Sequence, residues 1–127
     1  MKIVLSSAAP APVGPYSQAI RHAGVLYLSG QIPLDPTTGK LVGDDIEAQT
    51  ERVLENLRAV LAAAGVGFES LLRVGVFLAD MREFPRFNAV YGRLLGEARP
   101  ARSTVQVAAL PLGARVEIDA IAAVAAD

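Results

Sequence analysis

The chain has 127 residues, of which 52% are apolar and 20% charged, and its mean hydropathy is +0.36. This length and composition exclude an intrinsically disordered chain and predict one domain, residues 1–127, with a hydrophobic core of its own. The formal net charge is −1. That value argues against a general nucleic-acid binder, because such proteins usually carry a basic excess.

Missing residue types exclude several kinds of chemistry. The chain has no cysteine, which excludes disulfides, thiolate nucleophiles and thiolate zinc sites. The only histidine, His22, falls in a predicted turn, so no histidine cluster is available for a metal. The first residues lack a signal-peptide pattern, and the longest apolar run, Ala120–Ala126, is too short for a membrane span. We therefore expect a soluble, cytoplasmic protein without a cysteine- or histidine-based metal site and without a membrane span.

The first 43 residues predict three strands and a proline-rich loop. Ile3–Leu5 is a short apolar strand candidate. The segment 6–17 contains three prolines, which lack the amide donor that a strand ladder needs, so an ordered loop is expected. Gln18–Arg21 and Val25–Ser29 flank the turn residues His22–Gly24 and predict a β-hairpin.

A helix is predicted over Asp44–Ala64. Asp44 and Glu47 have the spacing of a capping box, and Gly65 is placed to end the helix in a left-handed conformation. Three glutamates along one flank suggest either a metal site or, far more commonly, a solvated helix face. The apolar stripe recurs at spacings of three and four and comprises Ile46, Thr50, Val53, Leu54, Leu57, Val60, Leu61 and Ala64.

The second half predicts strand, helix, strand, strand. Leu71–Leu78 is a mostly buried strand, Asp80–Glu83 is a second capping-box pattern, and Arg102–Ala109 and Arg115–Val124 are two further strands. The order β-ββ-α-β-α-ββ predicts an α+β fold whose two helices cover one face of a sheet. The second helix carries the stripe Phe84, Phe87, Tyr91, Leu94 and Leu95, with Asn88 as its polar member.

Two charged positions are candidates for chemistry. Arg102 begins a strand, and its planar guanidinium suits a carboxylate or phosphate. Strand alternation places Thr104 on the same face as Arg102. Glu117 lies two residues from Asp119 in a very apolar strand, where partial desolvation would raise the pKa of a carboxyl and suit it to proton transfer. A salt bridge between these carboxylates and Arg115 is the competing interpretation, and the spacing does not decide between them.

Four short motifs stand out along the chain. The C-terminal one is Pro100-Ala101-Arg102-Ser103-Thr104-Val105, followed by Leu110-Pro111 and Val116-Glu117-Ile118. The others are Gly14-Pro15-Tyr16-Ser17-Gln18-Ala19, Ser29-Gly30-Gln31-Ile32-Pro33 and Phe87-Asn88-Ala89-Val90-Tyr91. Together they resemble the motifs of the RidA/YjgF family of imine deaminases, occur in that family's order and span nearly the whole chain.

This resemblance implies a chorismate-mutase-like mixed sheet and a homotrimer with active sites between subunits. It also implies cofactor-free hydrolysis of reactive 2-imino and 2-enamino acids, such as 2-aminoacrylate and 2-iminobutanoate, to 2-oxo acids and ammonia. Such intermediates are released by pyridoxal-phosphate enzymes. Arg102 would hold the substrate carboxylate, and Glu117 would position the attacking water or relay its proton. The resemblance also implies Tyr16 as a third catalytic residue, and further substrate-binding residues at Ser29, Gly30, Asn88 and Thr104. Thr104 replaces a cysteine found in many members, so a cysteine nucleophile is not needed here.

Two other functions remain open at this stage. Some family members are described as ribonucleases or translation inhibitors, and residues 82–102 carry a local net charge of +3 from five arginines and two glutamates. No aromatic-rich basic face accompanies this bias, and no histidine pair exists to cut RNA. A non-catalytic ligand-binding or chaperone-like trimer would need Arg102 but not Glu117.

The expected spacing of Arg102 and Glu117 predicts a site shared between subunits. If the last two strands formed a hairpin with Ala109 opposite Arg115, Arg102 would lie opposite Ala122. Glu117 would then be five residues away along the sheet, or roughly 16 Å at about 3.3 Å per residue. A small imino acid cannot bridge that gap. The high apolar content also favours subunit contacts, with both helices of each subunit facing solvent.

Overall fold

A single six-stranded sheet organises the chain. The structure, a computed structural model, describes residues 1–126. The strands are β1 (Lys2–Val4), β2 (Ala19–His22), β3 (Val25–Gln31), β4 (Leu71–Leu78), β5 (Ala101–Gln106) and β6 (Val116–Ala123). The α-helices are α1 (Ile46–Ala63) and α2 (Phe84–Leu95), and 3-10 turns occupy Phe68–Ser70, Met81–Glu83 and Pro111–Gly113. The predicted element order β-ββ-α-β-α-ββ is confirmed.

The sheet has the strand order β1-β2-β3-β6-β4-β5 and is mixed. Only β4 and β5 pair in parallel, and every other neighbouring pair is antiparallel. The predicted hairpin of the last two strands is therefore wrong, because β4 lies between β5 and β6. β5 also ends at Gln106 instead of Ala109, because β4, its partner, ends at Leu78. The last bond between the two runs from the Val107 amide to the Leu78 carbonyl.

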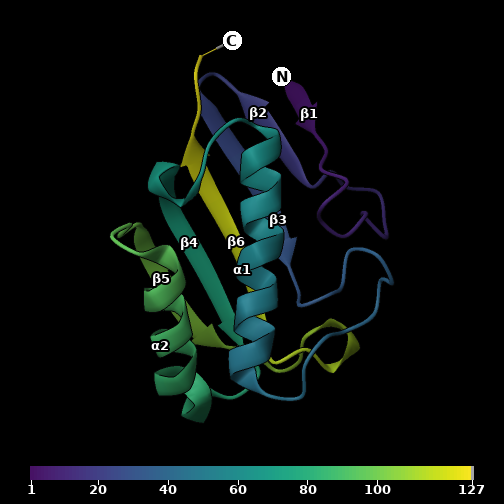
Figure 1. Cartoon of the computed structure of the whole chain (residues 1–127), viewed down its shortest axis with the longest axis vertical. Helices are drawn as coiled ribbons and strands as arrows, with labels where there is room; N and C mark the ends of the chain where they lie inside the picture. Colours follow the sequence, from purple (N-terminus) through teal and green to yellow (C-terminus); the bar gives the residue numbers. More distant parts are fainter. Residues whose placement is uncertain (127) are drawn as a thin grey trace.

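Both helices pack on the same face of the sheet (Figure 1). The predicted apolar stripe of α1 faces inward, and its central residues are fully buried between the helix and the sheet. On the sheet side of this core, β6 contributes its alternate, helix-facing residues, which are Val116, Ile118, Ala120 and Ala122. Among the described residues, no helix is long and apolar enough to cross a membrane.

The two helix starts differ from the predicted capping boxes. Asp45, and not Asp44, caps α1, because its side chain accepts a hydrogen bond from the Ala48 amide at 2.8 Å. Asp80 caps the 3-10 turn ahead of α2 by accepting from the Arg82 amide, so α2 itself begins only at Phe84. The end of α1 is as expected, since Gly65 takes a positive φ of 80°.

The second face of the sheet carries no helix (Figure 1). Apolar side chains stand on it beside charged ones, and Tyr27 and Val105 are 49% and 45% exposed there. Soluble sheets that face water on one side usually present polar residues there. An apolar open face of this kind is typical of a surface that another chain covers.

Candidate active site

Arg102 projects from β5 toward the helices. It lies opposite Val74 of β4, which in turn lies opposite Ala120 of β6, and both of these partners are buried under the helices. The Arg102 guanidinium donates to the Asn88 side-chain oxygen at 2.8 Å and lies 4.8 Å from the centre of the Tyr91 ring. The α2 helix therefore fixes the direction of the guanidinium, while its remaining N–H groups stay available to an anion.

A hollow of about 460 Å³ surrounds this guanidinium and is here called the arginine pocket. Its lining residues are Asn88, Tyr91, Gly92, Ala98, Arg99, Pro100 and Arg102. Tyr91 is 92% buried, and burial raises the pKa of its hydroxyl, while the charges of Arg102 and Arg99 act in the opposite direction. The pocket is thus cationic and has a buried phenol in its wall.

Glu117 projects from β6 on the opposite face of the sheet. Its neighbours in sequence, Val116 and Ile118, point into the core, so strand alternation turns Glu117 away from the helices. Burial raises the pKa of the Glu117 carboxyl, and the nearby charge of Asp119 raises it further. Within residues 1–126 no cation forms a salt bridge with Glu117. The competing bridge to Arg115 is absent, because Arg115 pairs with Glu83 at 3.1 Å.

A second hollow, of about 450 Å³, lies over Glu117 and is here called the glutamate pocket. Four predicted site residues line it: Tyr16, Ser29, Gly30 and Glu117. Gly30 is the residue that makes the close approach possible, because a Cβ at this position would overlap a Glu117 carboxylate oxygen. Any larger residue at position 30 would push the carboxylate out of its present position.

Two buried polar side chains hold the loop that carries Tyr16. The Ser29 hydroxyl donates to the Ser17 carbonyl at 2.6 Å and ties the loop to β3. The Gln18 side chain, 2% exposed, accepts from the Ser6 amide and donates to the Ser6 and Pro10 carbonyls. These bonds order the proline-rich segment as expected from its composition, and they place Tyr16, which is 50% exposed, at the mouth of the glutamate pocket.

The structure does not bring Arg102 and Glu117 of one chain together. They lie on opposite faces of the sheet, two strand positions and three residues apart, which corresponds to about 14 Å between their backbones. The separation resembles the roughly 16 Å expected from the hairpin, but its cause is different. The sheet itself stands between the two side chains, so one small molecule cannot touch both within a single chain.

Thr104 lies beside Arg102 on the helix-facing side of β5, as strand alternation predicts, and it lines neither pocket. Its hydroxyl oxygen is buried and has no hydrogen-bond partner within the described part of the chain. No hydrogen bond therefore connects this hydroxyl to the described residues of either pocket.

Sequence reasoning missed two residues of the arginine pocket. Tyr91 was interpreted only as a core residue, and Arg99 only as part of a local basic bias. The signals were present in the spacing, because Tyr91 lies three residues after Asn88 on α2 and Arg99 lies three residues before Arg102. Helical neighbours at this spacing share a face, so Asn88 already indicated that Tyr91 could reach the same hollow.

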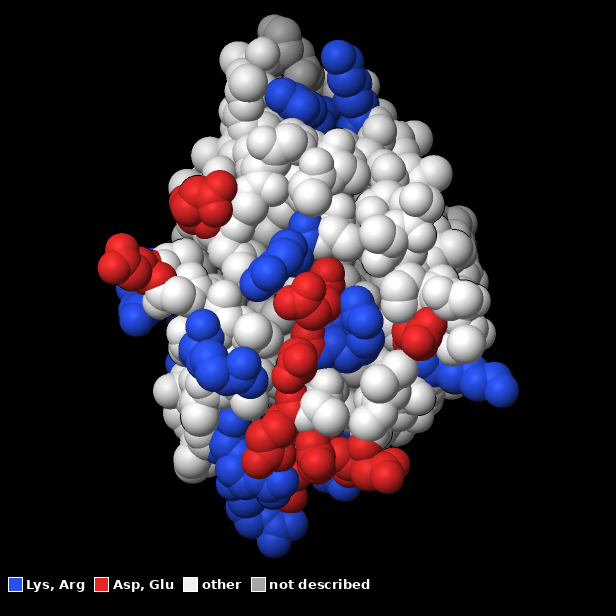
Figure 2. All heavy atoms as spheres, in the orientation of Figure 1, with Lys and Arg blue, Asp and Glu red and all other residues white. Residues whose placement is uncertain are grey.

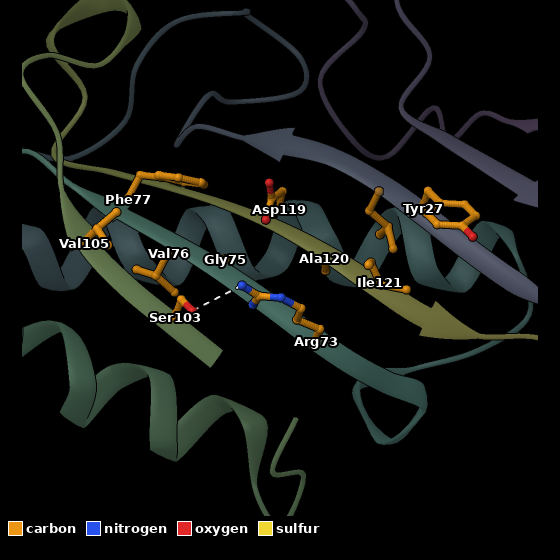
Figure 3. Close-up of a pocket in the computed structure, with 11 residues that line it drawn as sticks. Tyr27, Arg73, Gly75, Val76, Phe77, Ser103, Val105, Asp119, Ala120 and Ile121 are labelled. Atoms are coloured by element: carbon orange, nitrogen blue, oxygen red, sulfur yellow. Dashed lines mark hydrogen bonds between the residues drawn. The ribbon is translucent and has the colours of Figure 1, made fainter. Parts of the chain in front are cut away.

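A third hollow, of about 400 Å³, lies on the open face of the sheet and contains none of the predicted site residues (Figure 3). In Figure 3 Arg73 reaches across the strands and donates to the Ser103 hydroxyl at 3.1 Å. Tyr27, Ile121 and Val105 stand around it. Both polar and apolar side chains line this hollow.

The glutamates along α1 form ion pairs and do not gather into a metal site. Glu47 pairs with Arg86, Glu51 with Arg93, and Glu55 with Arg58. Figure 2 shows the result as a red stripe with blue side chains along its flanks. Among residues 1–126, no group of three or more histidine, aspartate or glutamate side chains has the geometry of a metal site.

Comparison with known proteins identifies the family. Residues 6–124 match a family model described as endoribonuclease L-PSP. The chain belongs to the RidA/YjgF family. The match includes both pockets and all four motifs, so the RidA/YjgF interpretation of the sequence is confirmed as to family and fold.

Relatives within the RidA/YjgF family cover nearly the whole chain. The chloroplastic Reactive Intermediate Deaminase A of Arabidopsis thaliana is 45% identical over 121 residues, which is 95% of this chain and 65% of that protein. The crystal structure of the Rid family protein YyfA from Yersinia pestis is 45% identical, with a TM-score of 0.94 over 97% of this chain and 98% of that one. That of E. coli TdcF with bound serine is 37% identical, with a TM-score of 0.94 over 98% and 100%.

Proposed function

We propose that this protein hydrolyses reactive 2-imino and 2-enamino acids, such as 2-aminoacrylate and 2-iminobutanoate, to 2-oxo acids and ammonia. One observation carries the proposal: the chain presents an oriented guanidinium in one pocket and a carboxyl of raised pKa in the other. The first suits the substrate carboxylate and the second suits proton transfer. The relationship to Reactive Intermediate Deaminase A of Arabidopsis thaliana supports this reaction class.

Arg102 anchors the substrate in this proposal. A guanidinium binds a carboxylate by donating two parallel charged hydrogen bonds to its oxygens. Asn88 accepts from only one of the Arg102 N–H donors, so others remain for the substrate. The anchored carboxylate fixes the neighbouring imine carbon in space, so water attack becomes an oriented step. The serine bound in the E. coli TdcF crystal structure is a ligand with the same α-carboxylate, which supports a ligand of this size and charge.

Glu117 moves the proton. The substrate nitrogen is protonated, so the imine carbon is electrophilic and needs no metal or covalent nucleophile. The Glu117 carboxylate takes a proton from the attacking water as the new C–O bond forms, and it then delivers that proton to the nitrogen. As the C–N bond breaks, the hydroxyl of the adduct passes its proton by way of Glu117 to the departing ammonia, leaving the 2-oxo acid and ammonium. A carboxyl whose pKa is raised by burial and by the charge of Asp119 is better matched to both steps than an exposed one.

The proposed assembly is a homotrimer in which each site takes Arg102 from one subunit and Glu117 from the next. The sheet separates these two residues within one chain, and a neighbouring copy can supply the missing half. The apolar open face around Tyr27 and Val105 is a suitable contact surface for that copy. The helices of each subunit would then face solvent, in keeping with the charged ion-paired surface in Figure 2.

A ribonuclease activity is the second candidate, because the matching family model is described as an endoribonuclease. The charge distribution of the chain argues against a ribonuclease activity. Three of the five arginines in residues 82–102 are paired with carboxylates: Arg82 with Asp80, Arg86 with Glu47, and Arg93 with Glu51. The local excess therefore does not form a continuous basic surface, which phosphate-backbone binding requires.

A coupled assay tests the proposal. A serine or threonine dehydratase generates the imine in the presence of semicarbazide, and formation of the semicarbazone is followed with and without this protein. We expect a strong reduction in semicarbazone, with a matching gain in 2-oxo acid. Glu117→Gln should lose this turnover. Unchanged semicarbazone formation at micromolar protein would refute the proposal, and retained ligand binding without turnover in the wild type would favour a non-catalytic binder. Cleavage of a labelled RNA in the same preparation would favour the ribonuclease.

A further inference from the structure

The arginine pocket contains a second cation that the proposed mechanism does not use. Arg99 lines the same hollow as Arg102 and is exposed to it. Pro100 follows Arg99 and restricts its backbone to extended conformations, so its position is well defined. One terminal nitrogen of its guanidinium donates to the Gly96 and Ala98 carbonyls at 2.6 and 2.7 Å. Its other N–H groups form no hydrogen bond with the described residues.

The charges in this pocket are unbalanced. No carboxylate lines it, so Arg99 and Arg102 give it a formal charge of +2. The arginines nearby are paired with acids: Arg86 with Glu47 and Arg93 with Glu51. Arg99 and Arg102 instead contact neutral groups, namely carbonyls and the Asn88 amide. A ligand with a single carboxylate would neutralise only one of the two.

The wall of this pocket also contains a buried hydroxyl, that of Tyr91. Arg102 can act on its oxygen only as a donor, so the Tyr91 proton itself has no acceptor among the described residues. Burial raises the pKa of this hydroxyl, while the charge and the hydrogen-bonding side chain of Arg102 and the charge of Arg99 lower it. A buried hydroxyl costs free energy unless a partner reaches it, and an anionic ligand lying between Arg99 and Arg102 would provide an acceptor. The pocket volume of about 460 Å³ accommodates a small dianion.

We propose that this pocket selects 2-imino acids that carry a second carboxylate, with Arg102 holding the carboxylate next to the imine and Arg99 holding the distal one. This inference rests on the proposed function and adds a preference among its substrates. The reaction that supplies such a substrate is a two-electron oxidation of a 2-amino dicarboxylic acid, which yields the corresponding imine. The alternative role for Arg99 is purely structural, as a cation that binds the carbonyls beyond the end of α2.

Stable product analogues test this inference. The affinities of the full-length protein for 2-oxobutanoate and 2-oxoglutarate are measured by titration calorimetry at low salt. The variants are Arg99→Gln, Arg99→Lys and the control Arg93→Gln, which alters a charged residue outside the pocket. We expect the wild type and the control to bind 2-oxoglutarate about tenfold more tightly, as one charged contact implies. Arg99→Gln should reduce this ratio to about one, leaving 2-oxobutanoate binding unchanged, and Arg99→Lys should give an intermediate ratio.

Two results would overturn the inference. One is equal affinity of the wild type for the two acids, a comparison that decides the question even if Arg99→Gln does not fold. The other is a preference for 2-oxoglutarate that persists in Arg99→Gln, which would assign Arg99 the structural role. If the wild type hydrolyses 2-iminobutanoate but shows no preference, the proposed function stands and only the dicarboxylate inference fails. If it neither hydrolyses the imine nor binds either acid, both fail.

Discussion

Removing the Arg102 side chain should abolish imine hydrolysis while leaving the fold intact. The guanidinium is half-buried, donates one hydrogen bond to Asn88 and lies over the Tyr91 ring. In the proposed reaction it makes two further charged hydrogen bonds to the substrate carboxylate. Each is worth roughly 1.5–3 kcal/mol, so Arg102→Ala should lower kcat/KM by about 10² to 10⁴.

The lysine variant separates charge from geometry at this position. Arg102→Lys keeps the positive charge but replaces the planar fork with a point charge. Its kcat/KM should therefore be only about tenfold above that of Arg102→Ala. The semicarbazide-coupled assay measures both variants, and Arg93→Ala, whose ion pair with Glu51 is exposed, serves as the control with full activity. Thermal unfolding checks that each variant folds. Wild-type activity in either Arg102 variant would refute the anchoring role.

Four further predictions concern Glu117, Thr104 and the α1 cap. Because the pKa of the Glu117 carboxyl is raised from 4.5, its contribution to stability is present at low pH and is lost as pH rises through the raised value. Glu117→Gln should therefore be inactive yet at least as stable as the wild type at pH 7. A clear loss of stability in thermal unfolding would contradict this. The acidic limb of the wild-type pH profile for kcat/KM should lie above the ordinary glutamate range, and a limb near pH 4 would argue against Glu117 as the proton carrier. Thr104→Ala and Thr104→Cys should keep substantial activity, because the hydroxyl has no partner; a loss as deep as that of Arg102→Ala would place this hydroxyl in the chemistry. Asp45→Ala should lower the free energy of unfolding by about 1 kcal/mol and Asp44→Ala by much less, and the reverse order in chemical denaturation would show that the cap is misassigned.

The sequence predicted the elements well because their local signals were strong. The apolar stripe of α1 and the His22–Gly24 turn are short-range patterns, and Ala23 and Gly24 both adopt the positive φ that such a turn needs. Strand alternation likewise placed Arg102 and Thr104 on one face of β5. The capping boxes failed because a one-residue shift from Asp44 to Asp45 leaves the local pattern almost unchanged.

Strand order was not predictable in the same way. β5 and β6 are neighbours in sequence and joined by a short loop, which favours a hairpin. The structure instead inserts β4 between them, and β4 pairs with both β5 and β6. Such pairings depend on long-range packing of the helices, which no local pattern records. The arginine pocket was missed in part for the same reason, because it forms only where α2 packs beside β5 and the segment that contains Arg99.

Subunit mixing tests most directly whether each site combines Arg102 of one chain with Glu117 of another. Inactive Arg102→Ala and inactive Glu117→Gln proteins are unfolded together, refolded in equal amounts and assayed for imine hydrolysis, and mixed assemblies are verified by native mass spectrometry. In randomly mixed rings about a quarter of the interfaces receive both intact residues, so about a quarter of the wild-type activity should return. No recovery in verified mixed assemblies would place both residues in one subunit's site and contradict the account.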